Sequence, residues 1–258
     1  MAVNLDMTDK LEKLRPELEM IQNQSVKNFT IDCLREAPDY FWTHPSSSSG
    51  KYHPPQSNGE GGLVRHTKAV VYFATKLCEV YGFTGDDMDC VLSACILHDI
   101  VKYGWPIARP HTTKTHDLEG TIFIGRIAEK TNFSQSLIER ISDGVCWHMG
   151  RWSTRTDGNK KVFPQEFSRT AEIVHLADVI AAQNQVSLIF LDSLDEKVKI
   201  NDGTFIMPFG KHKGKTMEEI PSDYLKWISE SFMEPKDFKI MQAAVKELNF
   251  RHEHHIEV

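Results

Sequence analysis

Residues 95–102 read Cys95-Ile96-Leu97-His98-Asp99-Ile100-Val101-Lys102, an apolar run in which an imidazole is directly followed by a carboxylate. Burying either polar group without a partner costs free energy, because each loses its hydration. A divalent metal ion satisfies both at once, since imidazole nitrogen and carboxylate oxygen are among its preferred ligands. The run therefore predicts a buried helix whose inner end carries metal ligands.

Four other segments place an imidazole or a carboxylate on a predicted helix. His66 ends the run Gly-Gly-Leu-Val-Arg-His, His116 begins His-Asp-Leu-Glu-Gly, and His148 lies in Cys-Trp-His-Met-Gly. Asp178 lies in Val-His-Leu-Ala-Asp-Val-Ile. A helical bundle can direct side chains from several helices to one interior point. We therefore expect a shared metal centre formed by His66, His98, Asp99, His116, His148 and Asp178.

The adjacency of His98 and Asp99 favours two ions over one. Neighbouring residues on a helix point about 100° apart, so Asp99 can reach past the ion bound by His98 to a second ion. His116 and His148 would complete that second site. Two divalent ions sharing a carboxylate are a common device for phosphate ester hydrolysis, because they activate water and neutralise phosphate charge. Imidazole and carboxylate ligands without Cys favour manganese, iron or cobalt over a structural zinc, with magnesium a further candidate.

Composition limits the classes of protein to which the chain can belong. Its 258 residues, 40% of them hydrophobic and 26% charged, are typical of a globular protein with one substantial core. The net charge of −6 argues against extended binding to duplex nucleic acid, although a local basic groove remains open. No apolar stretch approaches the roughly 20 residues that span a bilayer, and the first residues do not resemble a signal peptide. We therefore expect a cytoplasmic protein without a membrane partner, whose five cysteines are free thiols.

Hydrophobic periodicity predicts a mainly helical chain. Residues 5–37 have apolar positions at helical spacing and predict one or two helices. Further helices are expected at 63–81, 86–103, 117–130, 134–148 and 165–185. Segments 43–62 and 105–115 are rich in Pro, Gly and Ser or Thr and predict loops, while the polar segment 149–163 predicts a flexible rim. Almost nothing before residue 190 has the pattern of a strand.

The pattern changes near residue 200. Residues 203–210 alternate and turn like a short hairpin, and residues 216–233 and 235–250 predict two helices. We therefore expect three parts: residues 1–60 as N-terminal helices and loop, 61–195 as a helical bundle, and 200–258 as a small α+β module. The segment Gly210-Lys-His-Lys-Gly-Lys-Thr216 is not a phosphate-binding P-loop, because only three residues separate its first Gly from the Gly-Lys-Thr.

Residues 60–185 resemble the HD-domain metal-dependent phosphohydrolases, and most closely the two-metal branch of that superfamily. The resemblance rests on the runs around His66, His98-Asp99, His116, His148-Met-Gly and Asp178. That branch includes YhaM-like exoribonucleases, dinucleoside-tetraphosphate hydrolases and cyclic-dinucleotide phosphodiesterases. It implies an HD-domain helical bundle in which His66, His98, Asp99 and Asp178 hold one ion. Asp99, His116 and His148 would hold the other, with Lys102 near the substrate phosphate.

The chain departs from individual members of this superfamily. Lys102 stands where the single-metal deoxynucleotidases carry Glu, and the sequence shows neither the separate OB domain of the exoribonucleases nor a Gly-Tyr-Pro element after Lys102. Residues 207–228 resemble a small uncharacterised module of bacterial and phage proteins, whose basic and aromatic character suits either contact with nucleic acid or simple packing.

Other polar residues have two interpretations each. Lys102 lies one turn after His98 and is expected to face the site, with a catalytic role shared with Asp99. Arg65 and Arg151 are candidates for binding substrate phosphate, as is Lys102, although surface arginines are as often simply solvated. His44, His53 and His111 lie in loops and are expected to be solvated, although the loop of His111 is expected to overhang the site.

The leading function is hydrolysis of nucleotide phosphoesters, with (deoxy)nucleoside 5′-monophosphates as the expected substrates. The alternatives are a 3′→5′ exonuclease acting on short single-stranded nucleic acid, and a non-catalytic nucleotide sensor that keeps the metal site. The expected partner is therefore a nucleotide or a short single strand, and the sequence does not specify an oligomeric state.

Overall fold

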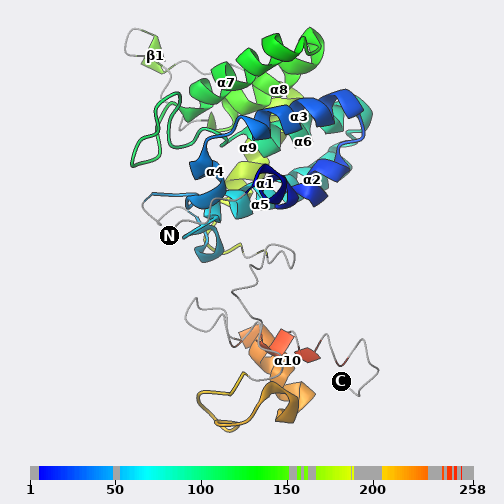
Figure 1. The fold of residues 1–258 in the computed structure, drawn as a ribbon. Coiled ribbons are helices and arrows are strands. Elements are labelled where there is room, and N and C mark those ends of the chain that lie inside the picture. Colours follow the sequence, from blue (N-terminus) through cyan, green and yellow to red (C-terminus); the bar gives the residue numbers. More distant parts are fainter. Residues whose placement is uncertain are drawn as a thin grey trace. The chain divides into compact units, whose positions relative to one another are not determined.

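The computed structural model describes residues 6–48, 53–150, 156–157, 160–161, 167–186, 188, 205–231, 240, 243–245, 247–248 and 251. The chain divides into two compact units, residues 1–193 and 194–258. The mainly helical class expected from the sequence is confirmed. The helices drawn in Figure 1 are described below for each unit by itself.

The first unit is a helical bundle (Figure 1). Its described helices are α1 (Met7–Glu12), α2 (Arg15–Met20), α3 (Gln24–Arg35), α4 (Asp39–Thr43), the 3₁₀ helix η1 (Pro55–Ser57), α5 (Gly62–Tyr81), α6 (Gly85–Leu97), α7 (His116–Thr131), α8 (Gln135–Trp147) and α9 (Arg169–Ala181). Helix α5 ends where the sequence predicts, because Gly82 adopts the left-handed conformation, at φ 71°, that closes a helix.

Residues 5–37 contain three helices rather than the predicted one or two. Pro16 lies in the first turn of α2, where a missing backbone N–H costs nothing and favours a new helix start. The Asn23 side chain then accepts hydrogen bonds from the backbone N–H groups of Ser25 and Val26 and caps α3. Local capping therefore divides an apolar pattern that is continuous in the sequence.

Helix α6 is the central helix of the bundle. Every residue from Asp89 to Leu97 is buried, and α6 packs against α3, α5, α8 and α9. The Asp89 carboxylate accepts hydrogen bonds from the backbone N–H groups of Gln22 and Asn23, at 3.0 and 2.7 Å. One side chain on α6 thus ties the turn between α2 and α3 to the core.

A short antiparallel hairpin lies between α8 and α9. Strand β1 (Thr156–Asp157) pairs with β2 (Lys160–Lys161). The sequence predicts almost no strand before residue 190, and these two strands of two residues each agree with that, although the hairpin itself is not predicted. Gly158 and Asn159 are residue types that favour tight hairpin turns, a local signal that the overall polarity of the segment conceals. Most of the rest of the predicted rim lies outside the described residues.

The second unit has a small core of its own, formed by Met207, Met217, Ile220, Leu225, Ile228, Ile240 and Ala244. Ile206 and Thr216 form an antiparallel bridge, followed by the 3₁₀ helix η4 (Met217–Glu219) and α10 (Ser222–Ser231). The predicted continuous helix at 216–233 is therefore wrong. Pro221 forces Ile220 into an extended conformation, so α10 begins only at Ser222. The predicted helix at 235–250 lies largely outside the described residues.

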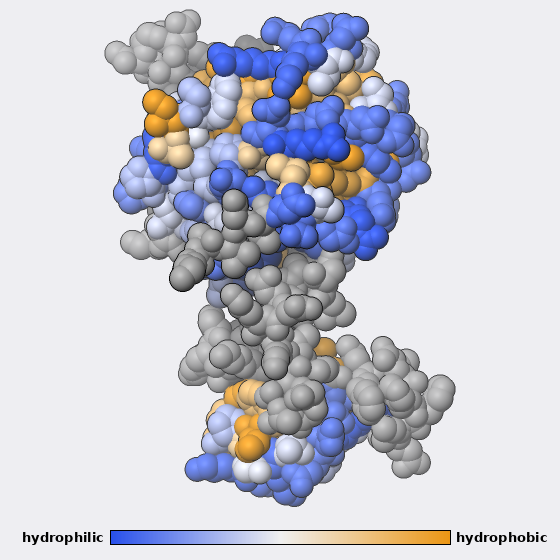
Figure 2. Space-filling model, viewed as in Figure 1, coloured by the Kyte–Doolittle hydropathy of each residue, from blue (hydrophilic) through white to orange (hydrophobic). Residues whose placement is uncertain are grey.

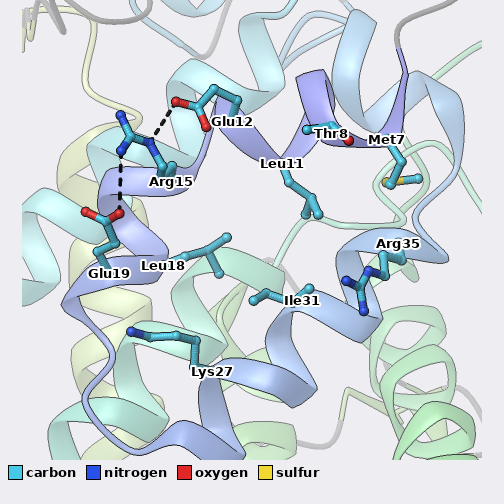
Figure 3. Close-up of a pocket in the computed structure, with 10 residues that line it drawn as sticks. All are labelled: Met7, Thr8, Leu11, Glu12, Arg15, Leu18, Glu19, Lys27, Ile31 and Arg35. Atoms are coloured by element: carbon cyan, nitrogen blue, oxygen red, sulfur yellow. Dashed lines mark ion pairs between the residues drawn. The ribbon is translucent and has the colours of Figure 1, made fainter.

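A surface groove of about 440 Å³ lies among α1, α2 and α3 (Figure 3). Apolar side chains form its floor and an ion-paired Arg15 lies at its edge, 2.7 Å from Glu12 and 3.6 Å from Glu19. The face of the molecule in Figure 2 is largely hydrophilic, with hydrophobic residues visible between the polar ones. The groove is lined by none of the predicted metal ligands: its residues are Met7, Thr8, Leu11, Glu12, Arg15, Leu18, Glu19, Lys27, Ile31 and Arg35.

Two sequence expectations concern the whole chain. Within the described residues, no helix is both long enough and apolar enough to cross a membrane. The five cysteines are free thiols, and four of them are buried: Cys33, Cys78, Cys90 and Cys95.

Replacing Gly144 should destabilise the bundle, because a Cβ at this position of α8 would lie 2.7 Å from the Ala94 Cβ of α6. We expect Gly144→Ala to lower the free energy of unfolding by about 1–3 kcal/mol. Gly125→Ala on α7 is the matched control, since a Cβ there meets nothing within 4 Å. The control should raise the free energy of unfolding by about 0.5–1 kcal/mol, because alanine favours the helix. Urea unfolding of both variants measures the difference, and equal effects would contradict the close packing of α6 on α8.

Candidate metal centre

The ends of four helices bring the predicted ligands together. His66 lies in the second turn of α5, His98 and His148 are the residues directly after α6 and α8, and His116 is the first residue of α7. Asp99 follows His98. All five are buried, with at most 5% of any one exposed. The predicted convergence of side chains from separate helices is thus present in the described residues.

Helix α6 ends at Leu97, whereas the sequence predicts that it continues to Tyr103. At this end, His98 Nδ1 lies 2.7 Å from the Cys95 carbonyl oxygen, which the backbone N–H of Asp99 would contact in a longer helix. The following backbone hydrogen bonds join residues three apart, from Ile100 N to Leu97 O and from Lys102 N to Asp99 O. These tighter turns carry Asp99 out of the helical path.

The same contact fixes the orientation of three imidazoles. Nδ1 lies 2.7 Å from Cys95 O in His98, 2.6 Å from Thr113 O in His116, and 2.7 Å from Val145 O in His148. A carbonyl oxygen can only accept a hydrogen bond, so each Nδ1 must donate. In the neutral ring, each Nε2 is then a lone-pair donor available to a metal ion.

These Nε2 atoms face one another at short range. The Nε2 atoms of His116 and His148 are 3.2 Å apart, and those of His98 and His66 are 3.4 Å apart. In the neutral rings of His116 and His148 both Nε2 atoms carry lone pairs, and two lone pairs at 3.2 Å repel each other unless a proton or a metal ion lies between them. The arrangement therefore fits the divalent ions that the sequence predicts.

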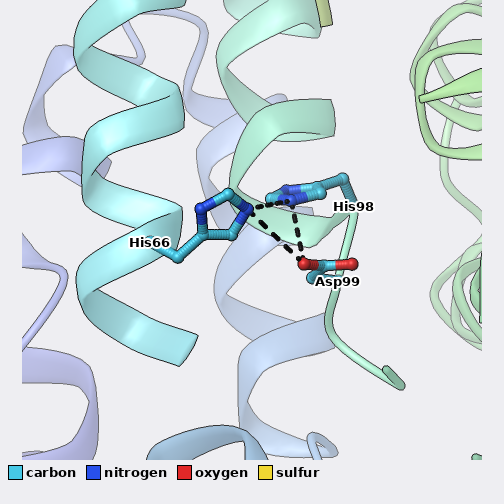
Figure 4. Close-up of side chains that lie close together, drawn as sticks. All are labelled: His66, His98 and Asp99. Carbon is cyan, nitrogen blue, oxygen red and sulfur yellow. Dashed lines mark hydrogen bonds and ion pairs between the residues drawn. The ribbon is translucent and has the colours of Figure 1, made fainter. Parts of the chain in front are cut away.

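The two carboxylate oxygens of Asp99 face different groups of ligands. Oδ2 lies 3.2 Å from His98 Nε2 and 3.7 Å from His66 Nε2. Oδ1 lies 3.1 Å from His116 Nε2 and 3.5 Å from His148 Nε2, yet it is buried without a well-formed hydrogen bond among the described residues. Two clusters thus share Asp99, and the atoms of each lie close enough to hold one ion. Figure 4 shows the first cluster, with His66 pointing toward His98 and Asp99.

Asp178 lies beside the first cluster. It belongs to α9, and its Oδ1 is 3.0 Å from His66 Nε2 and 3.8 Å from His98 Nε2. Its side chain is 19% exposed, which makes it the most accessible of the predicted ligands.

Burial and neighbouring charges shift the pKa values of the residues in the cluster in different directions. Burial lowers the pKa values of His66 and His148 below their usual 6.5. Burial opposes protonation of His98 as well, but the neighbouring Asp99 and Asp178 raise its pKa above that value. Although burial favours the acid form of Asp99, Lys102 and His98 hold the pKa of Asp99 well below its usual range. The site therefore combines an ionised carboxylate at Asp99 with neutral imidazoles at His66 and His148.

Lys102 is buried and points into the site, where its Nζ forms an ion pair with Asp99 Oδ2. It thus places a positive charge beside the shared carboxylate.

His175, one turn before Asp178 on α9, lies beside the second cluster rather than among its ligands. Its Nδ1 lies 2.6 Å from the carbonyl oxygen of His148. Gly150 permits this contact, because a Cβ there would approach the His175 ring to 2.4 Å.

The predicted phosphate-binding arginines lie in different settings. Arg65 donates from Nε to the Gln56 carbonyl at 2.5 Å and from Nη2 to the Asn58 carbonyl at 3.0 Å. Its guanidinium thus binds the loop before α5. Arg151 lies outside the described residues.

His53 is the residue at this site that the sequence analysis missed. It is expected to be solvated, but it is only 9% exposed, and its ring packs edge-to-face on His66 with centroids 4.6 Å apart. Burial and the positive charge of Lys102 lower the pKa of His53 to about 2, so it is neutral. His53 lies between a stretch rich in Ser and Gly and the pair Pro54-Pro55. This segment has no hydrophobic periodicity from which the burial of His53 could be predicted.

Comparison with known families agrees with this geometry. Residues 63–183 match the family model of the HD domain, and this range contains all six predicted ligands. The match supports the HD-domain phosphohydrolase superfamily, and HD domains are typically metal-dependent hydrolases. Residues 200–238 match the family described as "Putative quorum-sensing-regulated virulence factor". No curated protein and no solved structure matches the chain.

The metal-free protein should lose stability as the pH falls from about 7.5 to about 5.5. His66, His148 and His53 have pKa values below 6.5 when folded, so the unfolded chain binds protons that the folded chain does not. The free energy of unfolding must then decrease as the pH drops through 6.5. His98, with a raised pKa, acts in the opposite direction but is one group against three. Urea unfolding at several pH values measures the slope, and a stability that rises on acidification would contradict this electrostatic account.

Proposed function

We propose that this chain is a two-metal phosphohydrolase that hydrolyses phosphoester bonds of nucleotides, with (deoxy)nucleoside 5′-monophosphates as the expected substrates. One observation carries the proposal: the two oxygens of Asp99 face two separate histidine pairs. A structural site needs only one closed set of ligands, whereas a carboxylate shared between two sets suits catalysis on phosphate.

The residues divide into two ligand sets. His66, His98, Asp99 and Asp178 would hold one ion, and Asp99, His116 and His148 the other. When bound, two divalent ions activate water and neutralise the charge that develops on a phosphate ester during hydrolysis. The ligand chemistry favours manganese, iron or cobalt, and magnesium remains a candidate.

The chain itself supplies orientation and charge. The Nδ1 contacts to backbone carbonyls hold His98, His116 and His148 in a fixed orientation, so little motion is needed when an ion binds. Lys102 places a buried positive charge next to Asp99, where it can offset the negative charge of a bound phosphate. Asp99 and Lys102 are therefore the residues to which we assign catalytic roles.

Small substrates are favoured over polymers. The net charge of −6 disfavours long polyanions. A nucleoside monophosphate presents one phosphate to the ions and needs no extended binding track.

A substrate panel tests the proposal. The purified chain, loaded with manganese, should release phosphate from at least one deoxynucleoside or nucleoside monophosphate, and dinucleoside polyphosphates complete the panel. His116→Gln should reduce the bound metal from two ions to one and lower kcat/KM by about 100-fold or more, because it removes a ligand of the second set.

His111→Gln is the matched control for this panel, since His111 is an exposed loop histidine. It should leave metal content and turnover unchanged. Release of phosphate from no substrate with any of the four metals would end the nucleotidase proposal. Tight nucleotide binding without turnover would instead favour the non-catalytic sensor.

A second candidate, a 3′→5′ exonuclease on short single strands, is favoured by the second unit. Lys211, Lys213 and Lys215 are all exposed within one loop, and Trp227 of α10 is 48% exposed. Exposed lysines and an accessible aromatic ring are the features that bind the phosphates and stack the bases of single strands.

This second candidate predicts salt-dependent oligonucleotide binding. Replacing Lys211, Lys213 and Lys215 together by Gln should weaken binding of a short single strand and reduce the slope of log affinity against log salt by about 2. Lys226→Gln on α10 is the control, because it removes an exposed charge outside the loop. Fluorescence anisotropy over a salt series provides the measurement. Binding that neither depends on salt nor changes in the triple variant would exclude the strand-binding role.

A further inference from the structure

His53 lies at the metal centre without being one of its ligands. Its ring contacts the edge of His66, yet the two clusters of potential ligands among the described residues do not include it. It also differs from His98, His116 and His148, whose Nδ1 atoms all lie within hydrogen-bonding distance of a backbone carbonyl. His53 Nδ1 is buried and has no hydrogen-bond partner among the described residues.

The loop that carries His53 is tied firmly to the bundle. The backbone N–H and the hydroxyl of Ser46 both donate to the Ser57 carbonyl, at 3.0 and 2.8 Å. Gly62 allows this part of the loop to lie against the start of α5, because a Cβ there would be 2.0 Å from the same carbonyl oxygen. Arg65 binds the carbonyls of Gln56 and Asn58. These contacts hold the loop that carries His53 in one position against α5.

A buried polar atom held in place without a partner is costly, and beside a candidate active site it is completed by an ordered water or by a ligand. The surroundings indicate which ligand. His53 lies in the field of Lys102, whose positive charge favours an anionic group nearby, and beside the ligand set of the first ion. A neutral imidazole has one N–H to donate, and a phosphoryl oxygen is a strong acceptor.

We propose that His53 binds the substrate directly, by donating a hydrogen bond to a phosphoryl oxygen of the phosphate that is positioned at the first metal cluster. That the ligand is a phosphate follows from the proposed phosphohydrolase function. It makes His53 a substrate-binding residue, distinct from the metal ligands and from Lys102, and it assigns the loop at residues 53–62 to phosphate recognition.

His53→Phe is the decisive variant, because phenylalanine keeps an aromatic ring against His66 but cannot form a hydrogen bond. Isothermal titration of inorganic phosphate into the manganese-loaded protein should show affinity weakened about tenfold or more. Metal content, measured by elemental analysis, should stay at the wild-type level. The metal-free variant should melt at or above the wild-type temperature, because a buried polar atom without a partner has been removed.

Two further variants complete the design. His53→Gln retains an N–H donor and should recover part of the phosphate affinity, which a purely packing role would not produce. His111→Gln, in an exposed loop, should bind phosphate as the wild type does. Unchanged phosphate affinity in His53→Phe would overturn the inference, and so would loss of bound metal, which would make His53 a ligand.

These outcomes separate the inference from the proposed function. If the wild type binds phosphate through His53 but hydrolyses no nucleotide, the phosphohydrolase proposal fails and the binding role of His53 stands. If the wild type hydrolyses nucleotides and His53→Phe matches it in KM and in phosphate affinity, only the role of His53 fails.

Discussion

The metal centre depends on one repeated contact, the hydrogen bond from an imidazole Nδ1 to a backbone carbonyl three residues earlier. In His98 and His148 this bond forms where a helix ends, and in His116 it forms where a helix begins. Each contact fixes which nitrogen carries the proton and directs Nε2 toward the centre. His98 makes this contact where α6 ends, and the next residue, Asp99, lies between the two histidine pairs.

The bundle compensates for the cost of burying so many polar groups. Helix α6 is buried from Asp89 to Leu97. Its contacts with α3, α5, α8 and α9 hold the ends of the helices close together. Close helix contact at Gly144 brings α8 to α6, and Gly150 admits the His175 ring that supports His148. Small residues thus permit the close approach of α8 to α6 and of His175 to the backbone after α8.

The loop at residues 53–62 lies against the metal centre and carries His53. Arg65, a candidate for binding phosphate, holds this loop by its carbonyls, and the ring of His53 packs against His66 of the first cluster. A loop histidine without periodicity carries no signal of burial in the sequence, because burial there results from chain segments distant in the sequence. The early end of α6 and the hairpin of β1 and β2 were missed for a related reason: single local contacts decide them, and an average hydrophobic pattern does not record single contacts.

The sequence by itself determined the helical class, the helices around His66, His116 and His148, and the candidate ligands, because apolar periodicity and buried polar residue types are properties of short segments. Only the tertiary structure decided which oxygen of Asp99 faces which histidine pair, that Lys102 forms an ion pair with that carboxylate, and that His53 is buried. These features depend on distances between helices and loops far apart in the chain, which side-chain packing sets and which no local pattern specifies.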